Sequence, residues 1–87
     1  MGTVYILKSV RDGRYYIGST INLTQRLKHH MDRFTPTTKR FGGIELVFKQ
    51  EFGTIREARR IELRLKKLKR RDYIEKIIKE GVIKMHP

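Results

Sequence analysis

Two short apolar runs near the N-terminus constrain the fold more than any other feature. Residues 4–7 (VYIL) and 15–17 (YYI) are rich in β-branched and aromatic side chains, which favour β-strands. The polar segment between them contains Asp12 and Gly13, and an Asp-Gly pair between such runs favours a tight turn joining antiparallel strands. The sequence therefore predicts a strand, a turn and a second strand at the start of the chain.

Apolar periodicity predicts a helix and a third strand after this hairpin. Apolar side chains recur at helical spacing from residue 20 to 34, and Asn22 followed by Gln25 resembles a capping box at the helix start. Residues 35–43 contain Pro36 and two glycines and predict a loop. Residues 44–52 then alternate, as expected for a strand with one buried face. The apolar set of that strand is Ile44, Leu46, Phe48 and Phe52.

The C-terminal part predicts two charged helices. Thr54 and Glu57 form a capping box for the first helix, Asp72 and Glu75 suggest a similar start for the second, and Gly81 marks its end. The apolar stripes are Ile55, Ala58, Ile61, Leu65 and Leu68 in the first helix, and Ile74, Ile77 and Ile78 in the second. The order ββαβαα predicts an α+β fold with a small three-stranded antiparallel sheet flanked by helices. We expect one domain over residues 1–87, because so short a chain buries only a modest core.

Composition excludes several classes of function. The chain has no cysteine, which rules out disulfides and thiolate metal sites, and its three histidines lack the spacing of a zinc site. No apolar stretch approaches the roughly 20 residues of a membrane span, and the N-terminus shows no signal pattern. We therefore expect a cytoplasmic protein that does not bind membranes; its oligomeric state stays open.

The charge balance points to an anionic partner. Lysine and arginine number 21 against 9 acidic residues, a net charge of +12, and such a field attracts polyanions, with nucleic acid favoured. A solubilising surface and an acidic protein partner are the alternatives. Nine basic residues fall between 56 and 71, a face that would also suit an anionic membrane or a calmodulin-like partner if its apolar stripe were not needed for the core. The predicted nucleic-acid contacts are Arg56, Arg60, Arg64 and Lys67 on this helix, with Lys39 and Arg40 in the preceding loop.

Three polar residues stand close to the apolar stripes. Arg26 and His30 are four residues apart on the first helix and emerge on one side of its stripe; a solvated arginine and a half-buried histidine are the alternative reading. Glu62 lies inside the apolar stripe of the next helix. An unpaired charge there is costly, so we expect an arginine, lysine or metal-ion partner, and a purely structural ion pair is the alternative.

Four segments together resemble the GIY-YIG nuclease superfamily, in particular its small stand-alone bacterial members. They are TVY at 3–5, YIG at 16–18, the pattern S-T-x-N-L-x-x-R-x-x-x-H over 19–30, and EARRIELRLKK at 57–67. The resemblance implies hydrolysis of DNA phosphodiesters with Mg²⁺, or Mn²⁺ in its place. It also implies the following roles: Tyr5 activates water, Tyr16 orders the water or phosphate, Arg26 clamps the phosphate, His30 transfers or orients a proton, and Glu62 binds the metal.

The chain departs from the family pattern at two places. Thr3 and Val4 replace the Gly-Ile of the first motif, and Asn22 is the only asparagine, so the asparagine that some members carry after the metal glutamate is missing. The predicted function is a Mg²⁺-dependent endonuclease that recognises DNA structure or backbone, as in repair or recombination. The alternatives are a non-catalytic nucleic-acid-binding module and a nuclease subunit that is active only in a larger complex, where a partner protein would supply targeting.

Overall fold

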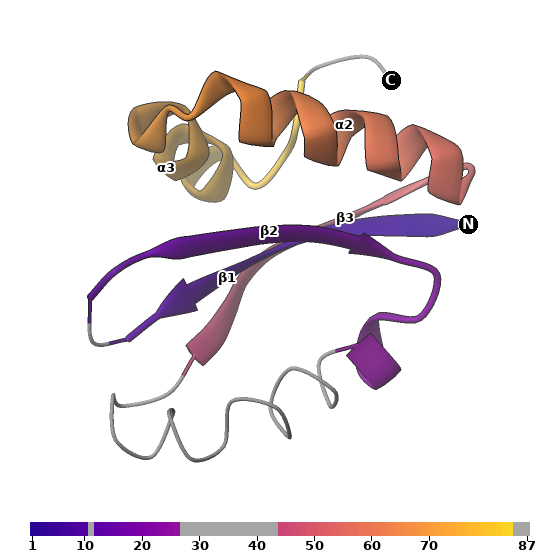
Figure 1. The fold of residues 1–87 in the computed structure, drawn as a ribbon, viewed down its shortest axis with the longest axis horizontal. Helices are drawn as coiled ribbons and strands as arrows, with labels where there is room; N and C mark the ends of the chain where they lie inside the picture. Colours follow the sequence, from indigo (N-terminus) through magenta and orange to yellow (C-terminus); the bar gives the residue numbers. More distant parts are fainter. Residues whose placement is uncertain (11, 27–43, 85–87) are drawn as a thin grey trace.

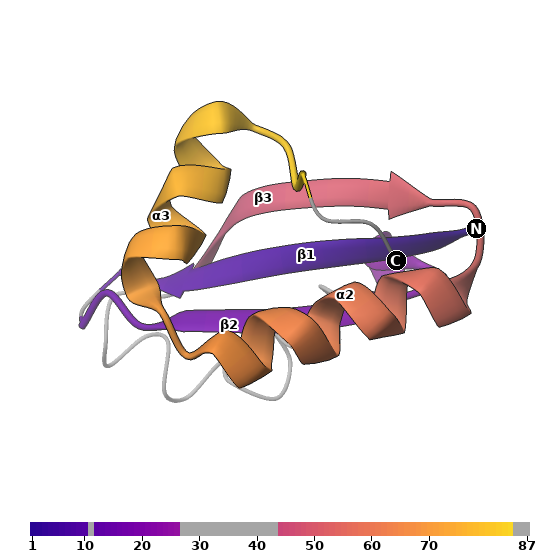
Figure 2. The ribbon, with the colours of Figure 1, turned by 90° about the horizontal axis from the view of Figure 1, so that it is seen from above.

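A three-stranded antiparallel sheet covered on one face by two helices forms the protein (Figures 1 and 2). The computed structural model describes residues 1–10, 12–26 and 44–84. The elements are β1 (Gly2–Ser9), β2 (Tyr15–Thr20), β3 (Ile44–Phe52), α2 (Ile55–Leu68) and α3 (Arg71–Glu80). Residues 23–26 are also helical and lie on the other side of the sheet from α2 and α3 (Figure 1). The predicted α+β class and ββαβαα order are confirmed.

The hairpin of β1 and β2 forms as predicted. The two strands pair antiparallel, with Tyr5 opposite Gly18. In the turn, Gly13 adopts a φ of 71° and donates its N–H to the Ser9 carbonyl at 2.9 Å, a left-handed conformation that favours glycine. Asp12 accepts the Arg14 N–H at 3.1 Å. This backbone hydrogen bond, followed by one from the Ser9 side chain, holds the pKa of Asp12 below its usual value.

The predicted helix start at Asn22 is also confirmed. Asn22 Oδ1 accepts the Gln25 N–H at 3.1 Å, which satisfies one of the backbone donors left free at a helix N-terminus. The rest of this predicted helix, including His30, and the predicted loop with Lys39 and Arg40 lie outside the described residues.

The third strand forms over the predicted range, but the prediction of a single buried face was wrong for Leu46. The register of β3 on β1 shifts between Ile6 and Leu7, so that Phe48 pairs with Ile6 while Leu46 pairs with Leu7. Val47 then has no partner on β1, as in a β-bulge, which reverses the alternation beyond it. Phe48 is buried under the helices, whereas Leu46 is 38% exposed on the opposite face.

The predicted cap of α2 is confirmed, and that of α3 was wrong. Glu57 donates its N–H to Thr54 Oγ1 at 3.2 Å. The residue before α3 is Arg70, which makes no side-chain cap. Asp72 lies inside the first turn and accepts a hydrogen bond from Arg70 instead. Since α2 ends at Leu68, with Lys69 as its left-handed C-cap, and α3 begins at Arg71, the N-cap position falls on Arg70. The predicted end at Gly81 is confirmed by its N–H bond to the Ile77 carbonyl.

The core lies between the sheet and the two helices. Val4 and Ile6 on the central strand β1 are fully buried beneath Ala58, Ile61 and Leu65 of α2. Phe48, Ile74, Ile77 and Ile83 complete the buried cluster. Figure 2 shows that α2 runs along β2 and β1, so this helix lies toward the β2 edge of the sheet. Within the described residues, no helix has the length and apolar character needed to cross a membrane.

Candidate active site

A pocket of about 720 Å³ runs along β2, the edge strand of the sheet next to β1. Its lining includes Tyr5, Tyr16, Arg26 and Glu62. These are four of the five residues predicted to be catalytic; the fifth, His30, lies outside the described part of the chain. Since neighbouring residues of a strand point to opposite faces, the pocket collects side chains from both sides of β2.

On one side of β2, a glycine makes room for the ring of Tyr5. Tyr5 is 2% exposed and is paired with Gly18. A Cβ atom on Gly18 would lie 2.5 Å from Tyr5 Cζ and collide with the hydroxyl as well, so the tyrosine ring occupies the space where a side chain would stand. The glycine of the YIG segment is therefore what allows the Tyr5 hydroxyl to reach the pocket.

Arg26 reaches this hydroxyl from the helical segment that follows β2. Its Nε donates to Tyr5 Oη at 3.2 Å. The Asn22 cap fixes the start of that helical segment, which places Arg26 one turn later beside the sheet. Tyr16 lies two residues before Gly18, hence on the same face of β2, and is 45% exposed. This side of the pocket thus carries two phenols and one guanidinium.

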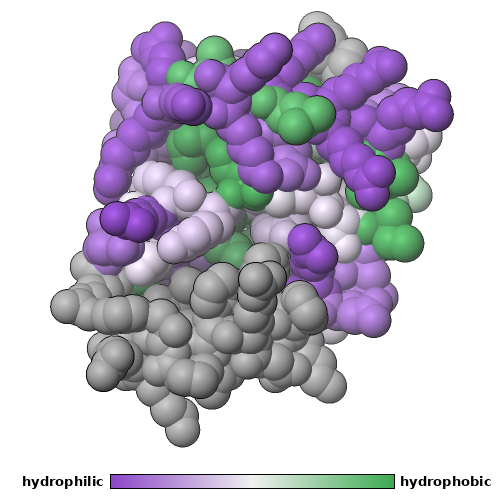
Figure 3. Space-filling model, in the orientation of Figure 1, coloured by the Kyte–Doolittle hydropathy of each residue, from purple (hydrophilic) through white to green (hydrophobic). Residues whose placement is uncertain are grey.

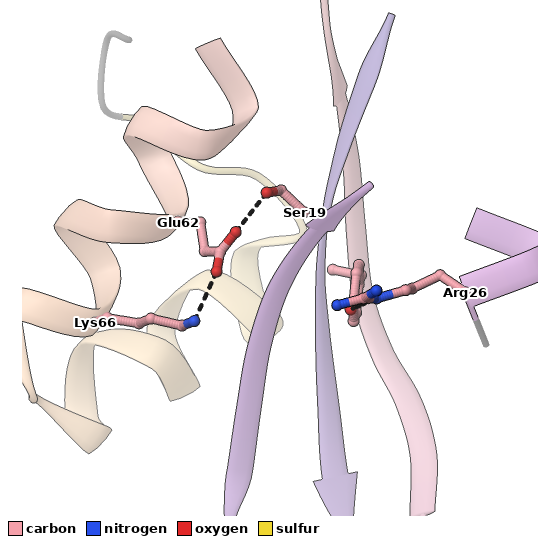
Figure 4. A network of polar contacts seen from close by, with 5 residues as sticks. Ser19, Arg26, Glu62 and Lys66 are labelled. Carbon is pink, nitrogen blue, oxygen red and sulfur yellow. Dashed lines mark hydrogen bonds and ion pairs between the residues drawn. The ribbon is translucent and has the colours of Figure 1, made fainter. Parts of the chain in front are cut away.

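On the other side of β2, Glu62 projects from α2 into the pocket (Figure 4). Its side chain is 16% exposed. One oxygen accepts a hydrogen bond from Ser19 Oγ, and the other lies 2.6 Å from Lys66 Nζ. Figure 4 shows these contacts on the opposite side of the strand from Arg26. The expected basic partner of Glu62 is therefore Lys66, one helical turn further along α2.

The donor set fits a divalent cation with few protein ligands. Among the described residues, no three histidine or acidic side chains gather as a metal cluster, and Glu62 is the only acidic side chain that lines the pocket. A carboxylate has about four lone-pair sites, so both oxygens retain acceptor capacity beyond Ser19 and Lys66. Mg²⁺ commonly keeps several waters and takes one or two carboxylates, which suits a site built on Glu62.

The pocket also contains cations that sequence reasoning did not assign to a site. They come from the hairpin turn, the end of α2 and the start of α3: Arg14, Lys66, Lys69, Arg70 and Arg71. The run of basic residues at 66–71 is visible in the sequence, but the tight connection that turns it toward β2 is not. Arg71 also stands over the ring of Tyr15, with Cζ 5.3 Å from the centroid, a cation–π geometry.

Arg70 and Asp72 form an exposed ion pair at the rim of this pocket. Arg70 Nη2 lies 2.8 Å from Asp72 Oδ2. The side-chain hydrogen bond lowers the pKa of Asp72 and raises that of Arg70. Both side chains are more than half exposed, so water screens this pair and its contribution to stability is small.

The predicted nucleic-acid contacts on α2 form a surface separate from the pocket. We call Arg56, Arg60, Arg64 and Lys67 the outer basic surface. All four are exposed, and none lines the pocket. Hydrophilic side chains gather over α2 and α3 above a paler band that follows β2 (Figure 3). The structure thus offers two basic regions, the outer basic surface and the pocket rim. The pocket rim consists of Arg14, Lys66, Lys69, Arg70 and Arg71.

Comparison with known proteins identifies the class of protein. Residues 1–77 match the GIY-YIG catalytic domain family. Because this match covers most of the 87 residues, the chain belongs to that family. The GIY-YIG domain suggests nuclease activity in general, and the nucleases of this family act on DNA and generally depend on a metal ion. The resemblance seen in the sequence is therefore confirmed.

Two relatives come from Bacillus species. A UPF0213 protein of Bacillus licheniformis is 40% identical over 82 residues, which cover 90% of this chain and 84% of the relative. UPF0213 protein YazA of Bacillus subtilis is 39% identical over 75 residues, which cover 82% of this chain and 75% of the relative. No solved structure gives a significant match to the chain.

Proposed function

We propose that the protein is a metal-dependent endonuclease that hydrolyses DNA phosphodiesters and recognises the backbone or structure of DNA more than its sequence. One observation carries the proposal: the Tyr5 hydroxyl, held by Arg26, and the Glu62 carboxylate line the same pocket. A hydroxyl, a permanent cation and a half-buried carboxylate are the groups that activation of water, clamping of a phosphate and binding of a hard cation require.

The residues divide these tasks between the two sides of β2. Tyr5 reacts as its phenolate, the form that the neighbouring Arg26 charge favours, and becomes a neutral phenol when it takes up the proton of the attacking water. Tyr16 orients that water or the phosphate. Arg26 carries a fixed positive charge and stabilises the charge that develops on the phosphoryl oxygens in the transition state. His30, which lies outside the described residues, assists proton transfer in this proposal.

Glu62 holds the cation, and Mg²⁺ is the physiological ion in this proposal, with Mn²⁺ as a substitute. Such an ion supplies charge neutralisation at the phosphate and the leaving oxygen when bound. Ser19 keeps the carboxylate in place through its hydrogen bond to Oε1. With Glu62 as the one acidic ligand among the described pocket residues, such an ion would keep waters that a phosphate oxygen could replace.

DNA contacts extend beyond the pocket in this proposal. The outer basic surface, together with Lys39 and Arg40, binds neighbouring phosphates. Contacts from lysine and arginine to phosphates position a protein on DNA but carry no sequence information, so the expected preference is for a DNA structure, as in repair or recombination. We place this activity in the cytoplasm.

The direct test is incubation of the protein with plasmid, single-stranded, flapped and branched DNA in Mg²⁺ or Mn²⁺. We expect cleavage of at least one form, and its loss in EDTA. Tyr5→Phe deletes only the hydroxyl, so it should remain folded and lose most of the activity. Tyr73→Phe is the matched control, because Tyr73 lies in α3 and does not line the pocket. Equal loss in both variants, or full activity in Tyr5→Phe, would contradict the assignment of Tyr5.

A second candidate function is a nucleic-acid-binding module without catalysis. The observation that favours it is the close ion pair of Glu62 with Lys66, which satisfies the carboxylate without a metal. This candidate predicts salt-sensitive DNA binding and no cleavage of any DNA form. A nuclease subunit that needs a partner predicts the same behaviour alone, but cleavage once the partner protein is added.

A further inference from the structure

We infer that Lys66 is an internal counter-ion that holds Glu62 while no divalent cation is bound and leaves the carboxylate when one binds. The inference rests on the proposed function, since it takes Glu62 as the metal ligand. It goes beyond that function because it assigns two roles to Lys66. Lys66 competes with the metal for Glu62, and it is a positioning residue that holds the Glu62 carboxylate while no metal is bound.

The contact itself places a cation where a metal would bind. Lys66 Nζ lies 2.6 Å from Glu62 Oε2. An ammonium is a compact, strongly hydrated point charge on a flexible stem, and it therefore imitates a metal ion more closely than a planar guanidinium does. A divalent cation on the remaining lone pair of this oxygen would lie close to the ammonium, and repulsion between the two positive charges favours departure of Lys66.

The two partners differ in how far they can move. The Glu62 side chain is 16% exposed, whereas that of Lys66 is 52% exposed. Ser19 also holds Glu62 through the other carboxylate oxygen, and α2 packs directly against the sheet at Ile61 and Leu65. The carboxylate is therefore fixed, while the ammonium can swing into solvent or toward a phosphate in the pocket.

Comparison with other ion pairs between residues four apart makes this pair distinctive. The carboxylates of Glu75 and Glu80 are 52% and 33% exposed beside Arg71 and Lys84, so water can solvate them if the partner leaves. Glu62 has less access to water, and a half-buried carboxylate without a counter-charge is costly. Departure of Lys66 is thus favourable only if another cation replaces it, which couples the movement to metal binding.

Removal of Lys66 should therefore strengthen metal binding in the absence of DNA. Lys66→Met keeps the aliphatic length and removes the charge. We expect Mn²⁺, measured by calorimetric titration, to bind this variant about three- to tenfold more tightly than the wild-type protein, since a partly exposed ion pair no longer competes. Lys66→Arg keeps a positive charge and should retain an affinity near the wild-type value.

Three further proteins complete the experiment. Arg59→Met is the matched control, because Arg59 is exposed on the same helix, does not line the pocket and has no assigned role; its Mn²⁺ affinity should stay unchanged. Glu62→Gln should lose the Mn²⁺ site. Lys66→Gln keeps a polar head and replaces Lys66→Met if circular dichroism shows that the methionine variant is unfolded. Unchanged or weaker Mn²⁺ binding in the folded charge-removal variant would overturn the inference.

Failure of this inference can be told apart from failure of the proposed function. Mn²⁺ titration needs no DNA and no turnover. Tighter binding in Lys66→Met by a protein that cleaves no DNA would support the counter-ion role and contradict the nuclease. Metal-dependent cleavage with identical Mn²⁺ affinities for the wild type and Lys66→Met would support the nuclease and overturn the counter-ion role.

Discussion

The two sides of β2 hold their polar groups in different ways. On one side, the Tyr5 ring is buried against Gly18, and backbone space decides where its hydroxyl lies. On the other, Glu62 is held by a hydroxyl and an ammonium, contacts that can be exchanged. Packing therefore fixes the Tyr5 hydroxyl, which we assign to water activation. The Glu62 carboxylate, which we assign to the metal, is held by polar contacts that leave it accessible to a ligand.

Among the variants that test this comparison, Arg26→Ala should show the largest effect, a loss of cleavage with little change in stability. Arg26 is exposed, so the variant should unfold at nearly the wild-type temperature. Loss of one charge-stabilising donor typically lowers turnover by about 10²- to 10³-fold, and cleavage of the preferred DNA form should fall by that factor. Arg59→Ala, an exposed arginine that does not line the pocket, is the control. Near-normal cleavage by Arg26→Ala would remove it from the site.

Gly18→Ala tests whether packing fixes the Tyr5 side. The added Cβ meets the Tyr5 ring, and overpacking of this kind costs about 1–3 kcal/mol. We expect the free energy of unfolding in urea to fall by that amount, together with cleavage in the folded protein. Gly53→Ala serves as the control, since its Cβ would approach only the end of the Glu57 side chain. Wild-type stability in Gly18→Ala would show that Tyr5 is not constrained by this glycine.

Salt dependence compares the outer basic surface with the pocket rim. Each neutralised phosphate contributes about −0.9 to the slope of log K against log salt concentration. Replacement of Arg60 and Lys67 by glutamine should make that slope shallower by about 1 for each phosphate that the variant no longer neutralises. The same replacement of Lys69 and Arg70 measures the contribution of the rim. A flat salt response of the wild type, or no change in the outer variant, would rule out the outer basic surface as a DNA-binding region.

The smallest expected effect concerns pH and the rim pair of Arg70 and Asp72. The pKa of Asp72 is lowered in the folded protein, so its stabilising contribution is present above the unfolded pKa of about 3.9 and is lost as pH falls through the folded pKa. Asp72→Asn should therefore melt slightly below the wild type at pH 6, with the difference vanishing toward pH 2. A difference that grows in acid would have the wrong sign for this pair.

Local signals in the sequence were sufficient for the hairpin and for two helix starts. The Asp-Gly turn and the Asn22 and Thr54 caps each depend on contacts within a few residues, and all three formed. The start of α3 was misjudged because the end of α2 lies so close to it. Leu46 was placed on the wrong face because a bulge depends on the partner strand as well as on the alternation within β3.

The candidate site was predictable only where a residue carried its own signal. Glu62 stood out as a charge within an apolar stripe, and Tyr5 and Arg26 through the family pattern. Ser19 and Lys66 lie within the quoted family segments but received no role, because a hydroxyl on an edge strand and one lysine among many become site residues only when α2 packs along β2. The basic side chains of the pocket rim likewise line the pocket only in the folded chain.

Glu62→Gln provides the most direct test of the central claim, that this carboxylate serves a metal-dependent nuclease. Melting temperature, DNA affinity in EDTA and cleavage in Mg²⁺ should be measured on this variant and on Glu80→Gln. The latter breaks another Glu–Lys pair between residues four apart, outside the pocket lining. An amide is a weaker ligand than a carboxylate for a hard cation, and the variant lacks a negative charge that would repel phosphate. We predict a folded Glu62→Gln protein that binds DNA as well as the wild type or better and does not cleave it, beside an active Glu80→Gln. A Glu62→Gln protein that loses stability but keeps full specific activity in its folded fraction would contradict the account.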